Sequence, residues 1–204
     1  RSEAEILPFI YSSPMDTVTG YNLTSSMLDN GHYPVVCRFL EEEWEKTFIE
    51  HYTDPRVFFA IGSKEQDTKA LQKIFAERTF SDKVKVSINI DVAHGDTEYI
   101  HKLYQYYSNQ PHVGYLMSGS ICTPEAAERS VRAGCTHLRV GIGPGSACTT
   151  RLKTGCGMPQ LTAVYKIHKH LQKIGRRRNV TIIADGGVRY PGDAVKYLAA
   201  GADA

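Results

Sequence analysis

The chain has 204 residues, a formal net charge of +2 and 42% hydrophobic residues, values typical of a soluble globular protein with one core. The nearly balanced charge gives no indication of a nucleic-acid partner, and no apolar run approaches the ~20 residues needed to span a bilayer. The five cysteines are odd in number and lack Cys-x-x-Cys spacing, so we expect reduced thiols, no zinc site and a cytoplasmic protein.

Short apolar runs alternate with helical patterns along the chain. The runs that we expect to form strands are bounded by glycine, proline or polar residues, and they cover residues 8–11, 34–39, 57–62, 84–91, 113–117, 138–141 and 180–185. Apolar residues three or four positions apart predict helices at residues 20–30, 41–51, 65–78, 96–108, 160–174 and 191–200, with one more that begins after a capping Thr123.

Seven successive strand–helix units predict a parallel sheet covered by helices, and they favour a (β/α)₈ TIM barrel over an open sheet. The glycine-rich and polar motifs follow strands, where such barrels build their active sites. The connector at residues 200–204 repeats the one at 133–138, which leads from a helix into a strand. Because a whole barrel usually takes ~250 residues, we expect a single catalytic domain over residues 1–204, truncated before the eighth strand.

The most informative stretch follows the sixth expected strand. Gly141, Gly143 and Gly145 alternate with other residues, and Ser146 and Cys148 come next. Glycines at this spacing let the backbone turn sharply and approach a ligand, and the amides of such a turn suit a phosphate. A thiolate beside that anion site would be a nucleophile. A tight turn with an ordinary buried cysteine is the alternative interpretation.

Three stretches together resemble the IMP dehydrogenase and GMP reductase family. Residues 141–160 match its catalytic loop, Gly-x-Gly-x-Gly-Ser-x-Cys-x-Thr, with Gly-x-Pro-Gln downstream. Residues 12–19, Ser-Ser-Pro-Met-Asp-Thr-Val-Thr, resemble its first barrel strand and loop, and residues 184–187, Ala-Asp-Gly-Gly, resemble its nucleotide-binding strand end. The stretches occur in the family's order and span nearly the whole chain.

This resemblance implies a cysteine nucleophile. Cys148 would attack C2 of a purine 5′-monophosphate and form a covalent intermediate, and Thr150 would help to activate water or ammonia. The residues implied to hold the nucleotide are Ser13, Met15, Gly145, Ser146, Asp185, Gly186 and Gly187. A role as a loop cap is the alternative for Asp185.

The resemblance also implies a nicotinamide cofactor, which would exchange a hydride with the same carbon. Asp91, Val92 and Ala93 would contact it, and Arg38 is our candidate for the 2′-phosphate that NADPH alone carries. A surface salt bridge explains Arg38 about equally well. A potassium ion would be held by the backbone carbonyls of Gly143, Gly145 and Cys148.

Two enzymes of the family share this chemistry. GMP reductase converts GMP and NADPH to IMP, ammonia and NADP, whereas IMP dehydrogenase converts IMP, NAD and water to XMP and NADH. We expect the reductase, because no CBS module separates residues 39 and 57 and because residues 91–95 and 153–155 look reductase-like. The dehydrogenase and a catalytically inactive nucleotide-binding paralogue are the alternatives. The resemblance further implies a homotetramer.

Overall fold

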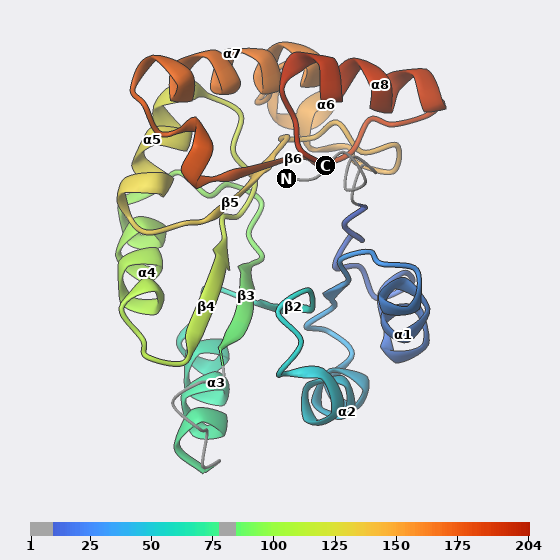
Figure 1. The fold of residues 1–204 in the computed structure, drawn as a ribbon, viewed down its shortest axis with the longest axis vertical. Coiled ribbons are helices and arrows are strands. Elements are labelled where there is room, and N and C mark those ends of the chain that lie inside the picture. The colour runs from blue at the N-terminus through green and yellow to red at the C-terminus, as the bar shows by residue number, and fades with distance from the viewer. Residues whose placement is uncertain (1–9, 78–84) are drawn as a thin grey trace.

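The computed structural model describes residues 10–77 and 85–204, which form a curled parallel sheet with helices outside it (Figure 1). Six strands lie across the sheet in chain order: β1 (Val35–Val36), β2 (Phe58–Ile61), β3 (Val86–Ile90), β4 (Val113–Met117), β5 (His137–Val140) and β6 (Thr181–Ala184). The α-helices of the same residues are α1 (Tyr21–Asp29), α2 (Glu41–His51), α3 (Glu65–Glu77), α4 (Glu98–Ser108), α5 (Pro124–Arg132), α6 (Thr150–Thr154), α7 (Gln160–Lys173) and α8 (Pro191–Ala200). The expected alternation of strand and helix is confirmed, although positions 8, 9, 78 and 84 of the expected elements lie outside the described residues.

Short pairings continue the sheet beyond both edge strands. Tyr11 forms an isolated parallel bridge with Tyr33, and the Ser12 amide donates to the Tyr33 carbonyl over 3.2 Å. At the other edge, the Ala184 amide donates to the Ala204 carbonyl over 2.8 Å. Of the first expected strand, the structure describes residues 10 and 11, and Tyr11 pairs there as an isolated bridge. The second expected strand is shortened to β1. The architecture is that of an incomplete (β/α)₈ barrel, as the sequence predicts.

Side chains alternate between the two sides of each strand, and two apolar clusters result. The larger cluster lies between the sheet and the helices and includes Ile88, Leu138 and Ile182. The smaller cluster lies on the inner side of the curl, where Tyr11 and Tyr33 pack against five buried side chains: Val35, Phe58, Ala60, Met117 and Ile183. The inner side is therefore filled by side chains, as in a complete barrel.

Leu138 and Val140 of β5 face the helices, so the alternate residues of this strand, His137 and Arg139, face the inner side of the sheet. Both inward side chains are ionisable. The His137 ring packs against three aromatic rings, at centroid distances of 6.1, 4.9 and 5.2 Å, those of Tyr11, Phe58 and Tyr115. Burial lowers the pKa of His137 to about 4, so the imidazole is neutral at pH 7.

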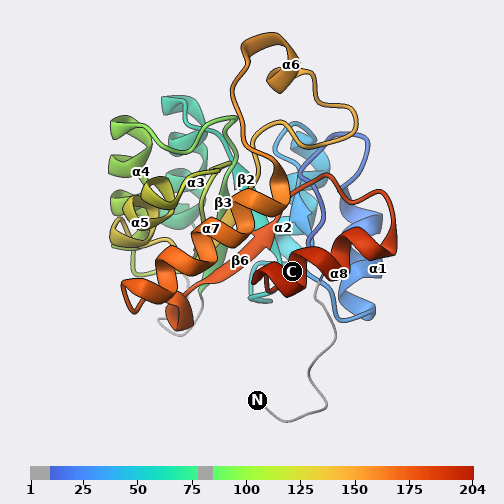
Figure 2. The same cartoon turned by 90° about the horizontal axis from the view of Figure 1, so that it is seen from above.

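Helix α6 has no counterpart among the expected helices. It follows the glycine-rich loop and stands away from the rest of the molecule (Figure 2). None of its five residues is buried, and Leu152 is 87% exposed. A helix this short shows too few turns for an apolar period to reveal it in the sequence. In the described parts of the chain, no helix is long and apolar enough to cross a membrane.

A buried hydrogen bond fastens α4 to the loop after β4. The Gly119 amide donates to the Tyr104 hydroxyl over 2.8 Å, and the Tyr104 side chain is fully buried. A second tyrosine of the same helix, Tyr106, accepts a hydrogen bond from the Gln72 amide group at the exposed surface. The two hydroxyls therefore differ chiefly in their access to water.

We predict that Tyr104→Phe lowers the free energy of unfolding by about 1–3 kcal/mol, because it leaves the buried Gly119 amide without its partner. Tyr106→Phe is the matched control, and its effect should stay within about 0.5 kcal/mol, since water replaces the lost partner. Urea denaturation of both variants measures the difference. Equal effects of the two substitutions would contradict this account of the loop.

Candidate active site

The loops that carry the expected site residues meet at the carboxyl ends of the strands. The Asp91 amide donates to the Ile61 carbonyl over 2.8 Å, and the Asp185 amide donates to the Val140 carbonyl over the same distance. Each aspartate thus continues the parallel ladder by one position past its strand. Both carboxylates are therefore held at the carboxyl ends of the strands, where barrel enzymes place their catalytic groups.

The glycine-rich loop packs directly against the Asp-Gly-Gly turn after β6. A Cβ atom added to Gly186 would lie 3.1 Å from the Gly145 nitrogen, and one added to Gly187 would lie 3.5 Å from the Pro144 carbonyl oxygen. Gly186 and Gly187 also have φ angles of 84° and 78°, which favour glycine. The structure therefore brings together Gly145, Gly186 and Gly187, three of the residues expected to hold a nucleotide phosphate.

Gln160 fastens the base of the same loop. Its Nε2 donates to the Val140 carbonyl over 2.6 Å and to the Asp185 carbonyl over 3.3 Å. Gly141 lies beside these groups, with a φ angle of 143°, and a Cβ atom there would come within 2.4 Å of the Asp185 carbonyl oxygen. The buried amide thus joins the ends of β5 and β6. This gives a structural role to the Gln of the Gly-x-Pro-Gln stretch, to which the sequence assigns none.

Cys148 is exposed at the tip of the loop, close to Ser146, which is exposed as well. Its amide donates to the Gly145 carbonyl over 3.1 Å, which closes a tight turn. Hydrogen bonds from the Thr150 hydroxyl and from the Thr150 amide lower the pKa of the Cys148 thiol. A lower pKa increases the fraction of reactive thiolate at neutral pH. The alternative of an ordinary buried cysteine is wrong for Cys148, because its side chain is exposed, and its role as a nucleophile stays a prediction.

A chain of ion pairs runs across the inner side of the sheet below these loops. The Arg139 Nε donates to Asp185 Oδ2 over 2.8 Å, and its Nη1 donates to Asp91 Oδ1 over 3.2 Å. Asp91 Oδ2 also accepts from the Arg38 Nε over 3.3 Å. Burial lowers the pKa of Arg139, but the two carboxylates outweigh that effect and raise it overall.

Arg139 is a site residue that sequence reasoning missed. It lies in an apolar run that was interpreted only as a buried strand, and its side chain is 16% exposed. The available signal was the charge itself, since arginine is almost never buried without a partner. The partners could not be named, because they lie 48 and 46 residues away in the sequence.

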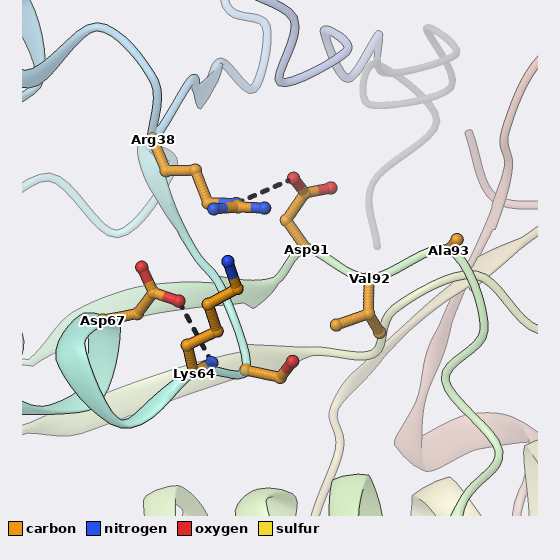
Figure 3. A pocket seen from close by; sticks show the side chains of 7 residues that line it. Arg38, Lys64, Asp67, Asp91, Val92 and Ala93 are labelled. Atoms are coloured by element: carbon orange, nitrogen blue, oxygen red, sulfur yellow. Dashed lines mark hydrogen bonds and ion pairs between the residues drawn. The ribbon is translucent and has the colours of Figure 1, made fainter.

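A cavity of about 370 Å³ opens on the Asp91 side of this chain of ion pairs. Arg38, Asp91, Val92 and Ala93, the four residues expected to contact a cofactor, all line it, together with Ser63, Lys64 and Asp67 (Figure 3). The Lys64 side chain points into the cavity toward the Arg38 guanidinium, so two cations face the same space. Ser63 and Lys64 were missed, although their position directly after a strand was the available signal.

A second cavity, of about 410 Å³, lies at the opposite end of the strands. It is lined by residues at the start of β5 and β6, such as Thr136 and Thr181, and by Tyr115, Arg178 and Asp203. None of the expected site residues within the described chain lines it. The location of the strand-end loops therefore favours the smaller cavity as part of the site.

The loop after the first expected strand is held against the end of β1. The Thr19 hydroxyl donates to the Ser13 carbonyl over 2.6 Å, and the Cys37 amide donates to the Thr19 carbonyl over 3.1 Å. Met15 is half-exposed in this loop. Among the described residues, no hydrogen bond joins Ser13 or Met15 to the Cys148 loop, so their role toward a nucleotide stays a prediction.

The sequence of this chain is similar to those of known proteins over nearly its whole length. The sequence model of the family described as "IMP dehydrogenase / GMP reductase domain" matches residues 4–204. The chain is 34% identical to a GMP reductase of Lactobacillus gasseri over 92% of this chain and 54% of that protein. It is 31% identical to a GMP reductase of Tolumonas auensis over 95% of this chain and 54% of that protein.

An inosine-5′-monophosphate dehydrogenase of Methanocaldococcus jannaschii is 55% identical over 44% of this chain and 17% of that protein. The chain thus spans about half the length of the curated GMP reductases that it matches. The family model covers residues 4–204, which is nearly the whole sequence. The chain therefore belongs to the IMP dehydrogenase / GMP reductase family.

Proposed function

We propose that this chain forms the nucleotide-binding and nucleophilic part of a GMP reductase. The observation that carries the proposal is the exposed Cys148 thiol, with its lowered pKa, on a glycine turn that packs against Gly186 and Gly187. An anion-binding turn beside a nucleophile suits a substrate that has both a phosphate and an electrophilic ring carbon. A purine 5′-monophosphate has both.

The proposed reaction begins at Cys148. Its thiolate adds to C2 of GMP, and the 2-amino group leaves as ammonia after it gains a proton. A bound NADPH would supply a hydride from its nicotinamide to C2, after which the C2–sulfur bond would break and Cys148 would return to its thiolate form. GMP, NADPH and one proton thus give IMP, ammonia and NADP. Thr150, which hydrogen-bonds the thiol, favours its thiolate form, and we assign to it the further role of assisting departure of ammonia.

We assign the nucleotide to the side of the site next to β6. The amides of Gly145, Ser146, Gly186 and Gly187 would hold the phosphate, because the close packing of the two turns concentrates amide donors there. Asp185 would accept from the ribose hydroxyls. Its Oδ2 is engaged by Arg139, so we assign Oδ1 to the ribose.

We assign the cofactor to the cavity beside Asp91. Its lining fits a nicotinamide dinucleotide phosphate, because Arg38 and Lys64 supply positive charge for phosphate groups, while Val92 and Ala93 supply a small apolar surface. Arg38 is held by Asp91 through Nε, and no hydrogen bond from its terminal nitrogens is seen among the described residues, so we assign these nitrogens to an anion. Backbone carbonyl oxygens are ligands that potassium prefers, and we assign a potassium ion to those of Gly143, Gly145 and Cys148.

The reductase is favoured over the dehydrogenase by the extent of similarity. GMP reductases match 92–95% of this chain, whereas the inosine-5′-monophosphate dehydrogenases that we compared match 44–57% of it. IMP dehydrogenase activity with NAD remains the second candidate, because the Methanocaldococcus jannaschii dehydrogenase is 55% identical over the 89 residues that it matches. A catalytically inactive nucleotide-binding paralogue would share the phosphate turn but not the reaction.

The proposal predicts that the full-length protein consumes NADPH and releases ammonia when it is given GMP. Cys148→Ala should reduce turnover by at least about 10³-fold, the order expected when a covalent nucleophile is removed, while GMP still binds. Cys156→Ala is the matched control, since Cys156 is also exposed but lies beyond α6, and it should retain turnover. NADH formation from IMP and NAD, without reaction of GMP, would instead identify the dehydrogenase.

A separate prediction concerns the Cys148 thiol itself. In a Cys156→Ala background, the pH midpoint of Cys148 alkylation by iodoacetamide should lie below that of an unperturbed cysteine, about 8.5. Thr150→Val removes the hydroxyl hydrogen bond, so it should raise the midpoint and slow alkylation at pH 7. An unchanged midpoint in the Thr150 variant would show that the threonine does not tune this thiol.

A further inference from the structure

Arg139 contacts both Asp185 and Asp91, the carboxylates that we assign to the nucleotide and to the cofactor. Its Nε bonds to Asp185, on the nucleotide side, and its Nη1 bonds to Asp91, on the cofactor side, over 2.8 and 3.2 Å. The three side chains are 16%, 23% and 18% exposed, in that order. One guanidinium therefore crosses the boundary between the two proposed ligands in a poorly solvated part of the site.

The shape of the guanidinium makes the two carboxylates depend on each other. Its nitrogens lie in one rigid plane, so a rotation that improves the bond to Asp185 also changes the angle of the bond to Asp91. Hydrogen bonds between charged groups in such surroundings are strong and directional. A ligand that fixes the position of one carboxylate thereby restricts the other.

Arg38 offers a natural comparison within the same chain of ion pairs. It bonds to Asp91 over 3.3 Å, and its guanidinium also stacks on the Phe39 ring, 4.0 Å from the centroid. Its recorded ion pair involves Asp91, with no ion pair to Asp185 among the described residues. Arg38 can therefore affect the cofactor side without spanning both sides.

We infer that Arg139 is a positioning residue that couples nucleotide binding at Asp185 to cofactor binding at Asp91. This inference rests on the proposed function, because it takes the two ligands from there. Arg139 needs no contact with either ligand: the nucleotide orients Asp185, Asp185 orients the guanidinium, and the guanidinium orients Asp91. Coupling of this kind is reciprocal, so each ligand should tighten the other by the same factor.

Calorimetry on the full-length protein tests the coupling directly. GMP and oxidised NADP are suitable probes, because oxidised NADP has no hydride to transfer and this pair cannot complete a turnover. The ratio of the GMP Kd without NADP to the GMP Kd with saturating NADP measures the coupling, and it should exceed 1 in the unmodified protein. Arg139→Met should weaken both ligands by about tenfold or more, the cost of losing a hydrogen bond to a charged group, and bring the ratio to 1.

Two further variants separate positioning from general damage. Arg139→Lys keeps the charge but has a single nitrogen, so it should fold, retain partial affinity for each ligand and still lose the coupling. Arg38→Met should weaken NADP much more than it weakens GMP measured without NADP, because the direct contact with Asp91 is lost while the Arg139–Asp185 pair persists. Thermal unfolding of each variant reports whether the fold is intact, and the lysine variant decides the test if the methionine variant fails to fold.

A ratio of 1 in the unmodified protein, or an unchanged ratio in a folded Arg139→Lys variant, would overturn the coupling while both ligands still bind and the proposed function stands. Failure of the unmodified protein to bind GMP or NADP at all would overturn the proposed function and, with it, this inference. The two failures are therefore distinguishable in the same set of titrations.

Discussion

The buried charge of Arg139 is the constraint on which the candidate site depends. A guanidinium on the inner side of a sheet is costly to remove from water unless carboxylates and hydrogen bonds offset that cost. Asp91 and Asp185 supply them from the ends of β3 and β6, two strands that are not neighbours in the sheet. The ion pairs therefore draw together loops from across the curl, and they connect the cavity beside Asp91 with the turn after β6.

The parts of the fold that could be predicted are those with a local cause. Apolar runs located all six strands, and helical periods located six of the α-helices in the described residues, because burial imposes a repeat on each element. The start of α5 was predicted from single residues: the Thr123 hydroxyl accepts from the Ala126 amide, and proline follows the cap. Alternating glycines indicate that the backbone near Gly145 makes a tight contact, although they do not name Gly186 as the partner.

The features that could not be predicted depend on partners distant in the sequence. Arg139 was hidden within an apolar strand because its two carboxylates become neighbours only when the sheet curls. Lys64 gains significance only when the loop after β2 faces the cavity beside Asp91. The second expected strand was overestimated, because β1 covers only Val35 and Val36 of residues 34–39, and strand length depends on pairing with the neighbouring strand rather than on apolar content alone.

The central claim is that a purine nucleotide binds between the glycine-rich loop and the turn after β6. A crystal structure of the protein with GMP tests it most directly. The account predicts the phosphate against the amides of Gly145, Ser146 and Gly187, the ribose on Asp185, and C2 of the base within van der Waals contact of the Cys148 sulfur. A phosphate bound instead by Arg38 and Lys64, with the base remote from Cys148, would contradict the account.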